Sequence, residues 1–212
     1  MNTQGLKLEY LGLFGIISLI SYTAMVVFSP LAYPGYNWLT MAVSDLGAVG
    51  APSTELAHQL SALYGPCSVV SIMAVCIGVS GCASNYLKLG IGFFAVMEWV
   101  SEIGYKMFPW VQDEGALFFQ NAMHISVTII VVAFSIVSMS LIAIGARIEG
   151  LNTLSNWALI CFAIMIIGAI GTGIMPKAVF GLFERFSTFS TVIFNAILGL
   201  YLLRGDLNCD LI

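Results

Sequence analysis

Six runs of about 20 mostly apolar residues follow one another along the chain, and they constrain the fold more than any other feature. Hydrocarbon offers no partner for a peptide group, so such a run crosses a bilayer as an α-helix that satisfies its own backbone. The sequence therefore predicts an all-α fold, a polytopic membrane helical bundle, in a single transmembrane domain over residues 1–212. The predicted spans are residues 8–29, 55–80, 87–108, 118–144, 155–175 and 183–203.

The composition agrees with a bilayer rather than water as the solvent of most of the surface. Hydrophobic residues make up 59% of the chain and charged residues only 8%, whereas a soluble domain carries about 25% charged residues. The formal net charge of -4 is spread along the chain without a basic patch, so nucleic acid is not an expected partner.

The distribution of basic residues predicts the orientation. We call the membrane face from which the first span starts side one, and the opposite face side two. The long side-two connection, residues 30–54, has no Lys or Arg. The positive-inside rule therefore predicts a plasma-membrane protein with both termini on the cytoplasmic side. The basic residues of side one are Lys7, Lys88, Arg147 and Arg204, and those of side two are Lys106, Lys177 and Arg185.

Prolines mark the ends of the first, third and fifth spans, at Pro30, Pro109 and Pro176. One interpretation is a bundle of three helical hairpins; the alternative is that proline is simply a common residue after a helix. Pro66 lies well inside the second span and is expected to kink it and free a carbonyl near Ala62.

Glu98 and Glu102 break the apolar pattern of the third span. An ionised carboxylate at the centre of a membrane helix costs about 2.5–3.5 kcal/mol on insertion scales. At helical spacing both carboxylates share one face, and Lys106 follows Glu102 at i+4. We expect this face to line the bundle interior or a wet cavity. Glu98 is predicted to handle protons or contact substrate, and Glu102 either does the same or pairs structurally with Lys106.

The fourth and sixth spans carry polar residues near side two. His124 lies one or two turns inside the fourth span, and an imidazole suits proton transfer near neutral pH. Glu184 and Arg185 begin the sixth span, and a polar stripe continues from them to Asn195. The planar guanidinium of Arg185 can hold a carboxylate or phosphate, or can simply snorkel to the interface.

Ser44 and Asp45 lie within the long connection, where they are typical of an ordinary turn or cap. They are candidates for a site because several other polar residues map to the same membrane depth, with Glu98 deeper in the membrane. We therefore predict one polar site near the extracytoplasmic face. Its side-two members are Ser44, Asp45, Glu102, His124, Glu184 and Arg185.

Three hypotheses for function follow, and whether the protein is an enzyme is left open. The first is a protein that binds or acts on a lipid or other amphiphile, by hydrolysis or acyl transfer. The second is a proton-coupled transporter that uses Glu98, Glu102 and Lys106, and the third is a non-catalytic membrane scaffold. For the first, the predicted catalytic residues are His124, Asp45, Glu184 and Glu98, and the predicted substrate contacts are Arg185, Ser44 and Glu102.

No nucleophile motif, phosphate loop or HExxH pattern occurs in the sequence, so no metal and no cofactor is predicted. Membrane lipids are the expected partners. Assembly with further copies of the chain is left open.

Three short motifs occur in order along the chain: residues 37–47 (NWLTMAVSDLG), Phe108-Pro109 followed by His124, and residues 181–185 (GLFER). In these the chain resembles the DUF998 family of uncharacterised membrane proteins, and the resemblance covers nearly the whole chain. It implies no activity. More distantly, Ser44-Asp45 with Pro52 and a following helix is similar to the Frag1/DRAM/Sfk1 group, which implies six spans and a link to membrane lipids.

Overall fold

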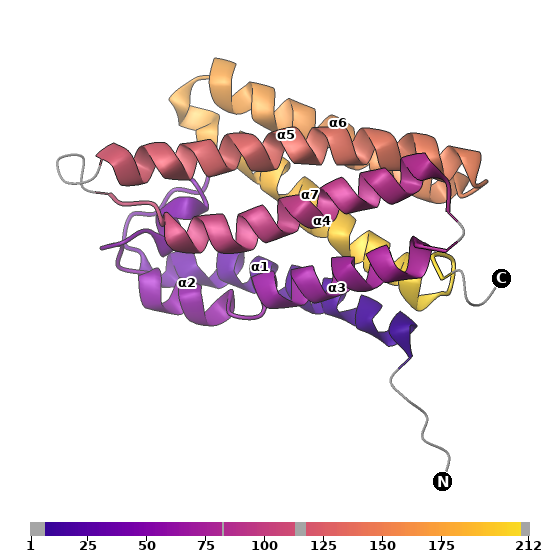
Figure 1. Cartoon of the computed structure of the whole chain (residues 1–212). Helices are drawn as coiled ribbons and strands as arrows, with labels where there is room; N and C mark the ends of the chain where they lie inside the picture. The colour runs from indigo at the N-terminus through magenta and orange to yellow at the C-terminus, as the bar shows by residue number, and fades with distance from the viewer. Residues whose placement is uncertain (1–6, 82, 113–117, 209–212) are drawn as a thin grey trace, which may run out of the picture.

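The computed structural model describes residues 7–81, 83–112 and 118–208, and every regular element in these ranges is helical. The long helices form one bundle with the first and last described residues at the same end (Figure 1). Short 3-10 turns (η1–η4) extend or connect the helices. In chain order the elements are η1 Leu8–Gly12, α1 Leu13–Phe28, η2 Ser29–Ala32, η3 Ser44–Gly47, α2 Thr54–Leu60, α3 Tyr64–Val79, α4 Asn85–Met107, α5 Phe118–Ile148, α6 Asn152–Ile174, η4 Lys177–Val179 and α7 Phe180–Leu203.

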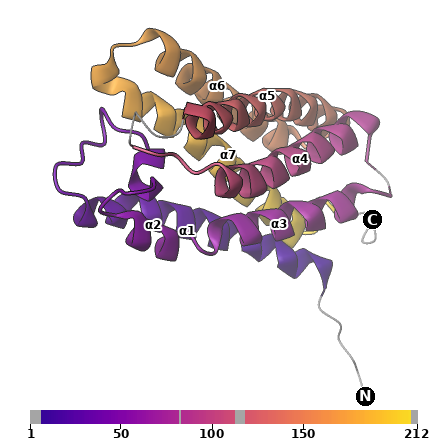
Figure 2. The same cartoon turned by 60° about the vertical axis from the view of Figure 1, so that its left-hand side comes forward.

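Five helical segments are long and apolar enough to cross a membrane, and each coincides with a predicted span. They are Leu8–Ala32, Thr54–Val79, Phe118–Ile148, Asn152–Ile174 and Lys177–Leu203. The remaining helix, α4, has 23 residues but carries two glutamates and two lysines, which lower its apolar character. It runs between α3 and α5 in both views of the bundle (Figures 1 and 2), so its charged face has helices to pack against.

The second span is broken rather than kinked. Residues 61–63 form a turn between α2 and α3, and Pro66 then falls in the first turn of α3, where a missing N–H leaves no helical bond unmade. Two serines of α1 bond to carbonyls beside the break. Ser21 Oγ donates to the Leu60 carbonyl at 2.6 Å, and Ser18 Oγ to the Tyr64 carbonyl at 2.8 Å.

The core has a large cluster within the bundle and a smaller one at side two. The large cluster takes buried side chains from α3 to α7, including Ile72, Phe94 and Phe194. In the smaller one, Leu46 of the long side-two connection is fully buried among side chains of α1, α2 and α7. The connection is therefore a folded cap over the side-two end of the bundle, and we call residues 33–47 the side-two cap.

Small residues let α1 approach α7 closely. A Cβ on Gly199 would overlap the carbonyl oxygen of Gly12, and a Cβ on Gly15 would lie 3.0 Å from the Asn195 carbonyl oxygen. Such backbone contact between membrane helices depends on glycine.

We predict that Gly199→Ala lowers the free energy of unfolding by about 1–3 kcal/mol, because backbone atoms cannot move aside for the added methyl group. Thermal unfolding in detergent, followed by circular dichroism, measures the change. The matched control is Gly92→Ala in α4, where nothing lies within 4 Å of the new Cβ; it should be neutral or stabilising by up to about 1 kcal/mol. Equal effects of the two substitutions would contradict close packing at this crossing.

Candidate functional site

Glu98 lies at the junction of α3, α4 and α7 and is only 4% exposed. The Ser68 hydroxyl of α3 donates to one carboxylate oxygen, and Asn195 Nδ2 of α7 donates to the other at 3.0 Å. The same amide nitrogen also lies 2.8 Å from Ser68 Oγ. These partners are neutral, and none of the ion pairs within the described ranges involves Glu98.

Two buried polar atoms near this junction have no hydrogen-bond partner among the described residues: Asn195 Oδ1 and Ser71 Oγ. Ser71 is one turn from Ser68 on α3 and lies close to Gly15, where an added Cβ would be 2.8 Å from Ser71 Oγ. Buried polar atoms of this kind cost free energy unless they form a hydrogen bond with water or with a neighbouring group that becomes protonated. The junction thus keeps hydrogen-bonding capacity that the protein itself does not use.

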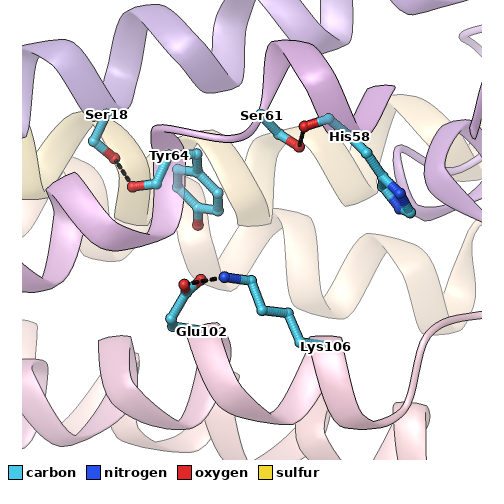
Figure 3. Close-up of polar contacts among 6 residues, drawn as sticks. All are labelled: Ser18, His58, Ser61, Tyr64, Glu102 and Lys106. Carbon is cyan, nitrogen blue, oxygen red and sulfur yellow. Dashed lines mark hydrogen bonds and ion pairs between the residues drawn. The ribbon is translucent and has the colours of Figure 1, made fainter. Parts of the chain in front are cut away.

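Glu102 lies one turn nearer side two and pairs with Lys106 of the same helix. The Glu102 side chain is 17% exposed and the Lys106 side chain 66% exposed, so this pair reaches the surface. The Glu102 carboxylate packs against the backbone of Gly65, where a Cβ would overlap it. Figure 3 shows the Tyr64 hydroxyl pointing from α3 toward this pair, while His58 of α2 points away from it.

Arg185 is 8% exposed and points its guanidinium into the side-two cap. Its Nη1 donates to the carbonyls of Trp38 at 2.8 Å, Met41 at 3.0 Å and Gly181 at 2.8 Å. Its Nη2 donates to the Tyr36 hydroxyl at 2.5 Å. Arg185 therefore holds the cap onto the first turns of α7.

Glu184 and Asp45 bind backbone amides at the start of η3. Glu184 Oε2 accepts from the Val43 amide at 2.9 Å, and Asp45 Oδ2 accepts from the Ala42 amide at 2.9 Å. Burial raises the pKa of Asp45 above its usual value, and burial raises the pKa of Tyr36 to about 12. Ser44 is half-buried inside this turn, so Ser44 and Asp45 of the cap lie together with Glu184 and Arg185 of α7.

His124 lies apart from that group, against the connection between α4 and α5. Its Nδ1 is 2.8 Å from the Phe108 carbonyl, and its ring centroid is 5.0 Å from that of Tyr105 and 5.6 Å from that of Trp110. None of its described contacts is with Asp45 or Glu184. His124 therefore does not pair with either of these predicted catalytic residues in this structure.

The connection after α4 is tied to the segment after η3 by backbone bonding. The Val49 amide donates to the Trp110 carbonyl at 2.8 Å, and Val49 forms an isolated parallel bridge with Val111. The side-chain amide of Asn121 in α5 forms two hydrogen bonds with Val111. Its Oδ1 accepts from the Val111 amide at 3.0 Å, and its Nδ2 donates to the Val111 carbonyl at 2.9 Å. The polar residues of side two thus mainly organise loops.

The structure divides the predicted site into a core junction around Glu98 and a surface region at side two.

Three residues that complete these two groups were not predicted from the sequence: Ser68, Tyr36 and Tyr64. Ser68 and Ser71 are three residues apart in α3, and this helical spacing of two hydroxyls was an available signal for a polar face toward Glu98. No cluster of three His, Cys, Asp or Glu side chains suited to a metal occurs in the parts of the chain that the structure describes.

The fold and the buried junction define the class: an integral membrane protein of the α-helical, polytopic type, with polar residues enclosed by its helices. More specifically, the chain belongs to the DUF998 family, whose model, described as "Protein of unknown function (DUF998)", matches residues 16–201. No curated protein and no solved structure matches the chain. The predicted family is confirmed, whereas the similarity to the Frag1/DRAM/Sfk1 group stays a prediction.

We predict that Arg185→Gln loosens the side-two cap, because four hydrogen bonds of the guanidinium are lost or weakened. Hydrogen exchange followed by mass spectrometry should show amides of residues 39–43 exchanging at least about tenfold faster, which corresponds to about 1.4 kcal/mol of local stability. The control is Lys177→Gln, a change of the exposed lysine before α7. Unchanged exchange in the Arg185 variant would contradict its role in holding the cap.

Proposed function

We propose that the protein is a proton-coupled membrane carrier in which Glu98 binds and releases the proton, with α4 as the sixth membrane crossing. The observation that carries the proposal is the burial of Glu98 among neutral partners from two other helices. An ionised carboxylate in this setting is costly, and a proton removes the charge without moving a helix. The site is therefore suited to a group that alternates between two protonation states.

Asn195 gives both protonation states a partner. Its NH₂ group donates to the carboxylate at 3.0 Å, and a half-turn of the amide would instead place Oδ1 to accept from a protonated carboxyl group. Oδ1 has no partner in the present arrangement, so the exchange gives it one, while Nδ2 gives up its bonds to the Ser68 hydroxyl at 2.8 Å and the Ser68 carbonyl at 3.2 Å. Because Asn195 belongs to α7 and Ser68 to α3, a change of protonation at Glu98 alters the bonds that join α4 to both helices.

Polar groups lead from Glu98 toward side two. Ser101 follows Glu98 on α4 and is buried, and the pair of Glu102 and Lys106 comes next. In the opposite direction the junction is covered by the apolar core, with Ile91 and Leu198 fully buried. This asymmetry supports proton entry from side two, the extracytoplasmic face by the positive-inside argument.

A second candidate function is action on a lipid or other amphiphile at side two, by hydrolysis or acyl transfer. Exposed apolar residues on this side favour it, since Leu31 is 82% exposed and Trp38 is 54% exposed. It requires Arg185 and His124 to leave the backbone carbonyls that they bind here, and so requires the cap to open. In the third hypothesis, a non-catalytic scaffold, Arg185 and His124 would keep their bonds to these carbonyls and the cap would stay closed.

The test of the proposal is infrared difference spectroscopy of the full chain in proteoliposomes after a drop in external pH. We expect the carbonyl stretch of a buried carboxylic acid to appear in the wild type and to be absent in Glu98→Gln. Glu55→Gln, a change of an exposed carboxylate in α2, should keep the band. A band that survives in Glu98→Gln would show that another group takes up the proton and would refute the proposal.

A further inference from the structure

A cavity of about 460 Å³ opens at side one, at the opposite end of the bundle from the side-two cap. It lies between the connection from α5 to α6 and the C-terminal end of α7, and no residue of the Glu98 junction lines it. Its walls combine aromatic, aliphatic and charged side chains. The lining residues that matter here are Thr153, Trp157, Ile197, Tyr201, Arg204 and Asp206.

Two helix ends of the same kind build its rim. After α5 the amides of Gly150 and Leu151 bond back to the carbonyls of Arg147 and Ala146, at 3.2 and 2.8 Å. After α7 the amides of Gly205 and Asp206 bond back to Leu202 and Tyr201, at 2.9 and 3.0 Å. Both are Schellman caps with glycine in the left-handed region, at φ 77° and 84°. The rim is therefore held by backbone hydrogen bonds.

The Schellman cap after α7 displays opposite charges on the rim of the cavity. Arg204 and Asp206 are both exposed, and neither takes part in a salt bridge within the described ranges. They are separated by Gly205, which redirects the chain between them. A ligand could therefore meet a guanidinium and a carboxylate together without first breaking an ion pair.

The wall of the cavity nearer the membrane interior is suited to the apolar part of a lipid. Trp157 and Tyr201 lie near the ends of α6 and α7, the level at which amphipathic rings favour the bilayer interface. Ile197 continues the wall toward the membrane interior, and Thr153 adds a hydroxyl at the mouth. The cavity thus changes from charged to apolar over a few residues, as a phospholipid does below its headgroup.

We propose that this cavity binds a zwitterionic phospholipid whose headgroup carries a primary ammonium, as phosphatidylethanolamine does. Arg204 binds the phosphate through its planar guanidinium, and Asp206 accepts hydrogen bonds from the ammonium. An anionic headgroup without an amine would meet repulsion from Asp206, and a choline group has no N–H to donate. The inference is independent of proton binding at Glu98.

The test is calorimetric titration of the detergent-solubilised full chain with short-chain phosphatidylethanolamine, phosphatidylcholine and phosphatidylglycerol. We expect phosphatidylethanolamine to bind most tightly. Arg204→Gln should weaken all three by about tenfold, the loss expected for one charge-assisted hydrogen bond. Asp206→Asn should weaken phosphatidylethanolamine by a similar factor, weaken phosphatidylcholine less, because the choline cation loses Coulomb attraction but no hydrogen bond, and improve phosphatidylglycerol.

Three further measurements separate the alternatives. Arg147→Gln changes an exposed arginine of side one outside the cavity lining and should bind like the wild type. Thr153→Trp should fill the mouth and block every lipid without changing charge. Free phosphoethanolamine should bind far more weakly than the lipid; equal binding would mean a soluble ligand and overturn the proposal. Equal affinity of the wild type for the three lipids, or wild-type binding by Arg204→Gln or Asp206→Asn, would also overturn it.

Discussion

The need to give every polar group in hydrocarbon a partner inside the protein governs this structure. Glu98 meets it with a serine from α3 and an amide from α7, and these bonds join three helices at the centre of the bundle. The same need explains the side chains beside the broken second span, where Ser21 bonds the Leu60 carbonyl. Ser21, Ser68, Glu98 and Asn195 therefore all lie where helices meet.

The side-two cap follows the same constraint at the membrane surface. A long connection with little regular structure leaves many carbonyls and amides to satisfy. Arg185 takes two of the carbonyls, those of Trp38 and Met41, and Glu184 takes the Val43 amide, so neighbouring residues at the start of α7 serve donors and acceptors alike. Leu46 then anchors the cap in the bundle.

The spans could be predicted from the sequence because a long apolar run has few alternatives in a membrane protein. The burial of Glu98 and the grouping of Asp45 with Glu184 and Arg185 also followed from the depth at which these residues map. The partners could not be predicted. Arg185 binds backbone carbonyls, which leave no signature in residue spacing, and His124 bonds a carbonyl of the preceding connection. The side-one cavity was missed because its rim comes from two helix ends far apart in the chain.

Glu98 and Asn195 join α4 to α7 by interacting with each other, and this interaction stabilises the bundle. The most direct measurement is a double-mutant cycle of Glu98→Ala and Asn195→Ala, with the free energy of unfolding measured in a bilayer-like medium. The interaction described here predicts a coupling energy of at least about 0.6 kcal/mol, the average for hydrogen bonds between membrane helices. Free energy changes that add within about 0.3 kcal/mol would contradict it, since independent sites behave in that way.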